Sequence, residues 1–451
     1  MDHTETRGMT RFLVVWAGQV VSMLGSNLTG FALGVWVYQQ TGSATRFAFI
    51  ALVTTLPAVL LSPLAGALID RVNRRSAMIL SDAGAGAATL VLALLLWRGD
   101  LRLWEIYLLL GVNATFAALQ WPAFSAATTL LVPKRHLGRA SGMVQMGEGA
   151  ATILAPLLAG ALVVAFGIQS VVLIDFGTFV FALITLLAVR IPAPPVSAEG
   201  VKGRGALWHE ALSGWSFIRQ RPGLLALLLL FATLGVSLGM VQVLLAPLVL
   251  SFASAAVYGR VASAAGLGML AGSLLVSVWG GPRRRISGIL GFLLVKGGIL
   301  ILAGLRPSAL LIGAAAFLFL FIDPILYACS QALWQSKVPP DLQGRVFAMR
   351  KMVGWSTLPL AFLCAGPLAD RVFEPLLAVG GPLAGSVGRF LGVGKGRGIG
   401  LLLIVLGCSV LLTVLAASRN SRLRRVEQEL PDALPEEAIP SADPLAVNAA
   451  G

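Results

Sequence analysis

The sequence predicts an all-α membrane protein in which twelve transmembrane helices form two pseudo-symmetric six-helix bundles. Of its 451 residues, 57% are hydrophobic and only 12% are charged, and the mean hydropathy is +0.86. Uncharged runs longer than twenty residues recur, which a soluble core of this size does not require. A β-barrel would instead need alternating segments of about ten residues. The runs here are continuous and rich in Leu, Ala and Gly, so helices are favoured.

The individual spans follow from the thickness of the bilayer. A hydrocarbon core about 30 Å thick takes roughly 20 helical residues, so each apolar run of that length counts as one span. The first run is too long for a cleaved signal peptide, and we expect it to be retained. Only a turn near Phe166 and Gly167 separates the fifth and sixth runs. The predicted spans are 12–38, 47–69, 76–97, 103–128, 140–166, 170–189, 222–250, 258–279, 286–305, 309–331, 350–370 and 399–417.

The longest internal polar stretch divides the spans into two sets of six. It opens with prolines and continues as an amphipathic helix from Leu207 to Arg219. The halves repeat, because VPKRHLGR before the fifth span matches VPPDLQGR before the eleventh, and the same offset of 206 places Gly160 on Gly366. Repeats of this kind imply a binding site between the halves. The predicted domains are an N-terminal bundle (1–189), a cytoplasmic linker (190–221), a C-terminal bundle (222–417) and a disordered cytoplasmic tail (418–451).

The distribution of Lys and Arg predicts the orientation, because positive loops stay on the cytoplasmic side. With both termini cytoplasmic, 24 of the 34 Lys and Arg residues fall on that side. Topology and attraction to anionic membrane lipids therefore explain the net charge of +14, and nucleic-acid binding is not needed. The segment from Phe373 to Gly398 then lies outside, as an amphipathic or re-entrant connection between the last two spans. We expect a multi-pass protein of the bacterial inner (plasma) membrane.

The stretch GALIDRVNRR, which ends the second span, carries a gating pattern. Gly66 and Asp70 are one helical turn apart, so the glycine permits close helix approach where the carboxylate reaches the cytoplasmic edge. The stretch resembles the loop between the second and third helices of the major facilitator superfamily. The matching positions are Gly66, Asp70, Arg71, Arg74 and Arg75. Asn73 replaces a glycine, and Asn tolerates a left-handed turn. The resemblance implies that Asp70 meets the other half near the start of the eleventh helix in one access state, whereas the alternative is that the arginines only anchor the topology.

Three longer stretches resemble the drug-efflux branch of that superfamily, which includes macrolide efflux proteins and the enterobactin exporter. They are Phe12–Thr45, Ser62–Asp82 and Ala365–Val372. The fifth span adds GEGAATILAPLLAG, which is similar to the antiporter motif of exporters. The motif positions are Gly147, Gly149, Pro156 and Gly160. Pro156 removes a helix hydrogen bond and Gly160 allows tight packing, although both residue types are ordinary in membrane helices.

Charges inside spans indicate candidate coupling sites, since each costs at least a few kcal/mol at the bilayer centre unless it is paired or hydrated. Glu148 lies about 14 Å along the helix from Arg139, near the midplane, and is the first candidate to carry a proton. Asp323, just before Pro324, is the second. The sequence suggests no partner for Lys296 in the ninth span. The fourth span lacks the arginine that many proton-coupled relatives carry.

Polar and aromatic residues within the spans are candidates for lining a largely apolar substrate cavity. They are Gln19, Asn27, Asn113, Gln120 and Trp121. Each could instead make a hydrogen bond between helices.

Taken with the resemblance, these features imply a monomeric secondary active transporter that exports a small amphipathic molecule by alternating access with proton antiport. The substrate would be a drug, a macrolide-like natural product or a siderophore. A lipid or lysolipid flippase of the same fold is the alternative, and a non-transporting scaffold or receptor is the reading from a different class. An enzyme is not expected, because the sequence has no nucleotide-binding glycine loop, catalytic triad or metal-ligand cluster. We therefore expect no cofactor and no metal.

Overall fold

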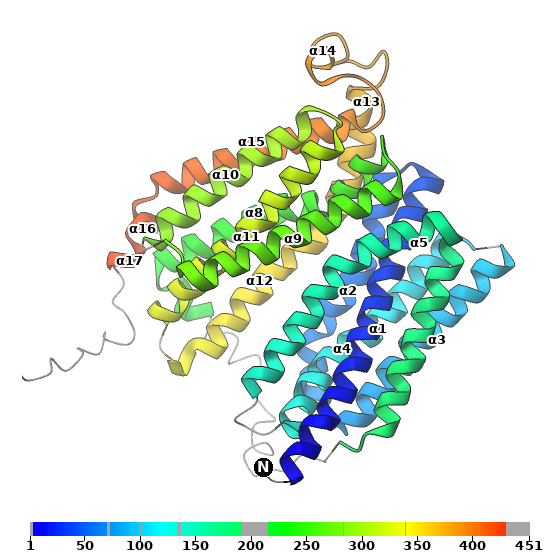
Figure 1. Cartoon of the computed structure of the whole chain (residues 1–451). Coiled ribbons are helices and arrows are strands. Elements are labelled where there is room, and N and C mark those ends of the chain that lie inside the picture. Colours follow the sequence, from blue (N-terminus) through cyan, green and yellow to red (C-terminus); the bar gives the residue numbers. More distant parts are fainter. Residues whose placement is uncertain are drawn as a thin grey trace, which may run out of the picture.

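The computed structural model describes residues 3–69, 73–99, 101–132, 137–191, 215–282, 284–338 and 340–429, and its regular structure in these ranges is helical (Figure 1). The N-terminal bundle consists of α1 (His3–Thr41), α2 (Ala44–Ile69), α3 (Arg74–Arg98), α4 (Leu103–Leu131) and α5 (Leu137–Ala188). The C-terminal bundle consists of α8 (Pro222–Leu250), α9 (Ala255–Trp279), α10 (Arg285–Leu305), α11 (Ala309–Lys337), α12 (Pro340–Pro367) and α15 (Arg397–Arg419). The short elements are the π-helix η2 (Leu368–Phe373), α13 (Glu374–Leu376), α14 (Gly388–Leu391), α16 (Ser421–Arg424) and α17 (Val426–Glu429).

Twelve membrane crossings are carried by eleven long helices. Within the described residues, eleven helices are long and apolar enough to cross a membrane. One of them, α5, has 52 residues, and at 1.5 Å per residue its length of about 78 Å suffices for two crossings. Gly167 breaks it with φ 78° and ψ 172°, a conformation that glycine adopts without a steric penalty. The predicted fold class and the turn near Phe166 and Gly167 are thus confirmed.

The start of α3 differs from what the sequence suggests. Asn73 has φ −60° and ψ 122°, an extended and not a left-handed conformation. Its side-chain oxygen accepts a hydrogen bond from the backbone nitrogen of Arg75 at 3.0 Å. Asn73 is therefore the N-cap of α3, where Asn satisfies one of the unpaired backbone donors of the first turn.

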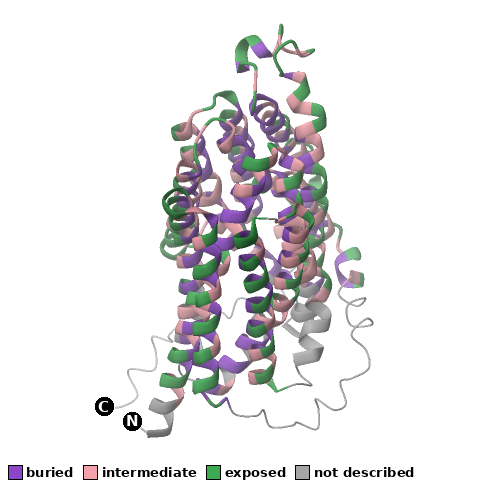
Figure 2. Ribbon diagram, turned by 90° about the vertical axis from the view of Figure 1, so that its right-hand side faces the viewer, coloured by how far each residue is buried: buried purple, intermediate pink, exposed green. Residues whose placement is uncertain are grey.

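The surface of the long helices is apolar. Val278, Leu310 and Phe166 are 90%, 85% and 70% exposed, and exposed residues run along the outside of the helices in Figure 2. A soluble monomer rarely exposes apolar patches of this extent. Buried Leu, Ile, Val and Ala side chains meanwhile fill the interior of each bundle. This distribution fits a protein that is surrounded by lipid.

The two bundles lie side by side and have distinguishable ends. We call the end that carries α13 and α14 the distal end, and the end where α1 begins and α15 finishes the terminal end. The bundles meet through α5 against α9 and through α2 against α12. In Figure 1 their ribbons are close together at the distal end and diverge toward the terminal end.

Three segments outside the long helices can be compared with the sequence. The segment after the eleventh span forms α13, a loop and α14 beyond the distal ends of the long helices (Figure 1). The chain after residue 418, expected to be disordered, is helical in α16 and α17. The carboxylate of Glu427 accepts a hydrogen bond from the backbone nitrogen of Ile286 at 2.7 Å, which caps α10. Most of the amphipathic linker helix, up to residue 214, lies outside the described residues.

Candidate functional site

A cavity of about 240 Å³ lies inside the N-terminal bundle and contains several predicted residues. Gln19 of α1 donates a hydrogen bond from Nε2 to Oδ2 of Asp82 at 2.9 Å, and Gln120 of α4 donates to Oε1 of Gln19 at 2.6 Å. Asp82 is 4% exposed, so this amide chain compensates a buried carboxylate. Asn113 lines the same cavity and donates to the backbone oxygen of Ala85 at 3.3 Å.

Glu148 of α5 also lines this cavity and is half-buried. Among the described residues, its carboxylate has no hydrogen-bond or ion-pair partner. Of the two acids in this cavity, Asp82 has a hydrogen-bond partner and Glu148 has none among the described residues. An ionisable side chain without a partner inside a membrane span is expected to face a hydrated cavity or to bind and release protons.

A larger cavity of about 570 Å³ lies in the C-terminal bundle and contains an ion pair between a buried lysine and a partly exposed aspartate. Lys296 of α10, 1% exposed, places Nζ 2.5 Å from Oδ1 of Asp323 on α11, whose side chain is 41% exposed. The same Nζ lies 3.7 Å from the centroid of the Phe319 ring. The sequence gives no partner for Lys296, because the two residues belong to different spans and no spacing rule connects them. Thr152 and Pro156 of α5 border this cavity, so both bundles contribute to its wall.

The antiporter-like motif lies at the contact between α5 and α9. A Cβ added to Gly160 would lie 2.9 Å from the backbone oxygen of Ala255, and one added to Gly259 would collide with the backbone oxygen of Pro156. The hydroxyl of Ser263 donates to the backbone oxygen of Ile153 at 2.8 Å. The two helices therefore touch backbone to backbone, which larger residues would prevent.

The other two motif glycines lie on different faces of α5. Gly147 packs against Val20 of α1, and Gly149 faces Leu270 of α9.

At the distal end, α12 and η2 meet the start of α2. The carboxylate of Asp370 accepts hydrogen bonds from the hydroxyl of Ser43 at 2.5 Å and from the backbone nitrogens of Ala44 and Thr45 at 2.9 and 2.8 Å. A Cβ on Gly366 would collide with Thr45. Asp370 thus caps a helix of the opposite bundle, where a negative charge is favoured.

A ring contact joins the bundles in the same region. Phe31 of α1 and Tyr258 of α9 stack with centroids 4.7 Å apart and an interplanar angle of 9°. This stacking adds to the contacts that hold the two bundles together toward the distal end.

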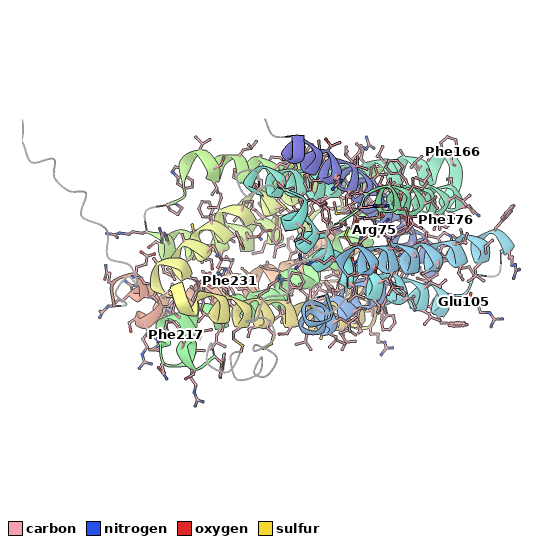
Figure 3. The ribbon with its side chains drawn as sticks, turned by 90° about the horizontal axis from the view of Figure 1, so that it is seen from below. Arg75, Glu105, Phe166, Phe176, Phe217 and Phe231 are labelled. Atoms are coloured by element: carbon pink, nitrogen blue, oxygen red, sulfur yellow. The ribbon has the colours of Figure 1, made fainter. Side chains whose placement is uncertain are left out.

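The predicted gating stretch is described only in part. Asp70 and Arg71 lie outside the described residues, and for Gly66 the backbone alone is described. Arg75, labelled in Figure 3, donates from Nε to the backbone oxygen of Leu186 at 3.1 Å and from Nη2 to that of Leu187 at 2.9 Å. These bonds stay within the N-terminal bundle and tie the start of α3 to the end of α5, and Arg74 begins the same helix.

Two predicted cavity residues do not join the others. Asn27 is exposed on α1 and is not among the described residues that line these two cavities. The side chain of Trp121 lies outside the described part of the chain. Sequence reasoning also missed Ser43 and the role of Asp370, because a contact across more than 300 residues leaves no local pattern.

Twelve crossings in two repeated bundles, with a cavity that both bundles border, define a membrane transport protein. The chain belongs to the Major Facilitator Superfamily, whose family model matches residues 15–362. It is a transporter and not an enzyme, and the predicted resemblance to the drug-efflux branch is confirmed.

Three curated relatives are exporters by name. Macrolide efflux protein A of Streptococcus pyogenes is 29% identical over 80% of this chain and 90% of its own length. Multidrug efflux pump Tap of Mycolicibacterium fortuitum is 26% identical over 86% and 97%, respectively. Enterobactin exporter EntS of Salmonella typhi is 25% identical over 74% and 80%.

Solved structures show the same fold at low identity. A bacterial homolog of the human lysosomal transporter Spinster, in an inward-facing and unoccupied conformation, matches with a TM-score of 0.70 and 16% identity over 93% of this chain and 97% of its own. The nucleoside transporter NupG matches with a TM-score of 0.68 and 11% identity over 91% and 99%.

Proposed function

We propose that this transporter exports a small amphipathic molecule across the bacterial inner membrane by alternating access, in exchange for protons. One observation carries the proposal: the bundles are held together at the distal end by Asp370, Gly366 and the α5–α9 contact, while their ribbons diverge toward the terminal end (Figure 1). With both termini cytoplasmic, as the Lys and Arg distribution favours, this is an inward-facing state. The exporter relatives support the outward direction of transport.

The two ends of the α2–α12 pair carry matching sequences, which supports a reciprocal gate. Residues 65–72 read AGALIDRV and residues 365–372 read AGPLADRV, so six of the eight positions are identical. The octapeptide that contains Asp370 ends at the start of α2. Asp370 now caps α2 at the distal end. In our proposal Asp70 caps the start of α12 when the terminal end closes, and one latch opens as the other forms.

Two acids that line the cavities are candidates for coupling transport to protons. Glu148 has no compensating partner among the described residues and, in our proposal, takes a proton from the outside and releases it inside. Asp323 is the second candidate, since its exposed side chain faces the larger cavity while Lys296 holds it. A carrier needs different proton affinities in the two access states, and rearrangement around either carboxylate would supply them.

Growth and accumulation assays test the proposal. A pump-deficient bacterium that expresses the protein is screened with macrolides, siderophores and lysolipids, with and without a protonophore. We expect lower accumulation of a macrolide or a siderophore, and loss of this effect with the protonophore. Asp70→Asn should insert normally but transport poorly, whereas the control Glu105→Gln, which alters a carboxylate bonded within its own helix turn, should behave as the wild type. Unchanged accumulation of every compound, or full activity of Asp70→Asn, would contradict the proposal, and movement of lysolipids alone would favour a flippase.

A further inference from the structure

A second cavity in the C-terminal bundle extends the path toward the terminal end. It has a volume of about 620 Å³ and lies among α8, α11 and α12. Its lining residues on α8 precede those that line the 570 Å³ cavity, and those on α11 follow them. On α12 its lining begins at Phe347, whereas that of the 570 Å³ cavity begins at Gly354, so this cavity lies nearer the terminal end. Gly354 of α12 lines both cavities. A molecule that enters from the terminal end therefore meets this cavity before it reaches Lys296 and Asp323.

The lining combines aromatic rings with two cations. The rings belong to Phe231, Tyr327, Trp334, Phe347 and Trp355. The cations are Arg350 and Lys351 of α12, and the described lining contains no carboxylate. Figure 3 shows Phe231 on the C-terminal bundle, apart from Arg75 and Glu105 on the N-terminal bundle.

Arg350 is held in place by neutral groups. Its Nη1 donates to Oε1 of Gln331 at 2.9 Å, and its Nη2 donates to the hydroxyl of Ser330 at 3.0 Å. Its guanidinium carbon lies 5.6 Å from the centroid of the Trp334 ring, and Nζ of Lys351 lies 4.8 Å from that of Trp355. These partners fix the orientation of the guanidinium without neutralising its charge. A half-buried, oriented and uncompensated guanidinium is a binding group for a carboxylate or phosphate.

We propose that this cavity, the cationic aromatic pocket, binds an organic anion whose charged group meets Arg350 and Lys351 while its apolar body packs against the rings. Accepting our proposal of export, this defines the substrate class as an amphipathic anion and the pocket as its first binding site. The geometry favours a ligand over simple anchoring of α12 to lipid headgroups, because Arg350 points into a cavity beside Trp334 and not to the exposed surface of the helix.

A binding experiment on the detergent-solubilised full chain tests the pocket. The probe is 1-pyrenebutyrate, with uncharged 1-pyrenebutanol and cationic 1-pyrenebutylamine for comparison, and binding is followed by energy transfer from tryptophan to pyrene. We expect the acid to bind at least about tenfold more tightly than the alcohol. Arg350→Gln should remove most of this preference without weakening binding of the alcohol. The control Arg419→Gln removes an exposed cation from the same end of the same bundle and should change neither affinity.

The design keeps the pocket testable if a variant folds poorly. If Arg350→Gln does not remain monodisperse, Lys351→Gln at the neighbouring exposed position is used in its place. We expect Lys351→Gln to reduce the preference for the acid over the alcohol about threefold.

Competition experiments then identify the source of the anion. Displacement by lysophosphatidylglycerol but not by lysophosphatidylcholine assigns a lipid headgroup, and absence of displacement assigns a non-lipid amphiphile, both with the charge preference intact.

Three results would overturn the inference: equal binding of acid and alcohol, tighter binding of the amine, or an unchanged preference in the arginine and lysine variants. The binding measurement needs neither vesicles nor a gradient. Its result therefore tests the pocket even if the export proposal fails.

Discussion

Asp370→Asn is expected to weaken closure of the distal end. In the structure the carboxylate accepts one hydrogen bond from a hydroxyl and two from backbone nitrogens at the start of α2. Asparagine keeps the size of the side chain but has one acceptor oxygen and no charge. The contact joins the two bundles, so its loss acts on the equilibrium between access states and not on the stability of one bundle.

The size of the effect follows from the bonds that are lost. A hydrogen bond to a charged group contributes about 1.5–3 kcal/mol, and a negative charge at a helix N-terminus contributes about 0.3–1 kcal/mol. Since asparagine can still accept one bond, we expect a loss of about 2 kcal/mol, or about 30-fold in the ratio of closed to open distal ends. A starting ratio of about 100 to 1 would then fall to about 3 to 1.

Spin-label distance measurements between Gln40 on α1 and Phe252 after α8, both exposed at the distal end, check this expectation. The three native cysteines are replaced by alanine beforehand. The matched control is Glu374→Gln, because Glu374 also accepts hydrogen bonds from backbone nitrogens, those of Gly396 and Ile399, but within a single bundle. We expect a long-distance population in Asp370→Asn alone. An unchanged distribution, or the same shift in both variants, would refute the latch.

Further expectations concern the other charged and close-packed positions. Glu148→Gln should abolish uphill export driven by a pH gradient in proteoliposomes while sparing downhill exchange, and continued accumulation against the gradient would exclude it as the carrier. Asp323→Leu should destabilise the protein by about 3–5 kcal/mol in thermal unfolding by leaving Lys296 buried and unpaired, whereas the double variant with Lys296→Met should recover most of the loss; no recovery would show that the two charges are not coupled. Gly160→Leu should cost the distal-closed state about 1–3 kcal/mol by forcing α5 away from α9, and normal transport by this variant would argue against the contact. A single cysteine at Val379, 85% exposed, should react with an impermeant maleimide only from outside the cell, and labelling from the cytoplasm alone would invert the topology.

Much of the fold could be predicted because the bilayer imposes lengths that the sequence records directly. Each span appears as an apolar run of defined length, and the turn at Gly167 appears where two runs meet. The conformation of Asn73 could not be predicted, because asparagine suits both a left-handed turn and an N-cap, and only the neighbouring backbone decides between them. The order beyond residue 418 was missed for a related reason: Glu427 gains its helix-capping role from α10, which lies far away in the sequence.

The residues of the candidate site could also be predicted only in part. Gln19, Asn113, Gln120 and Glu148 could be selected from the sequence because polar groups inside spans are costly and must face a cavity or a partner. That rule does not distinguish a residue that faces a cavity from one that pairs with a neighbour, and Asn27 satisfies it without being among the described residues that line these two cavities. The pairings themselves depend on how helices are arranged. Asp370, the acid that caps α2, is more than 300 residues away in the sequence. Arg350 can be recognised as a candidate binding residue only once rings on two other helices are seen to line the same cavity. A transporter of this fold therefore shows in its sequence which residues cannot face lipid, while the packing of the two bundles decides whether each one binds a substrate, moves a proton or closes a gate.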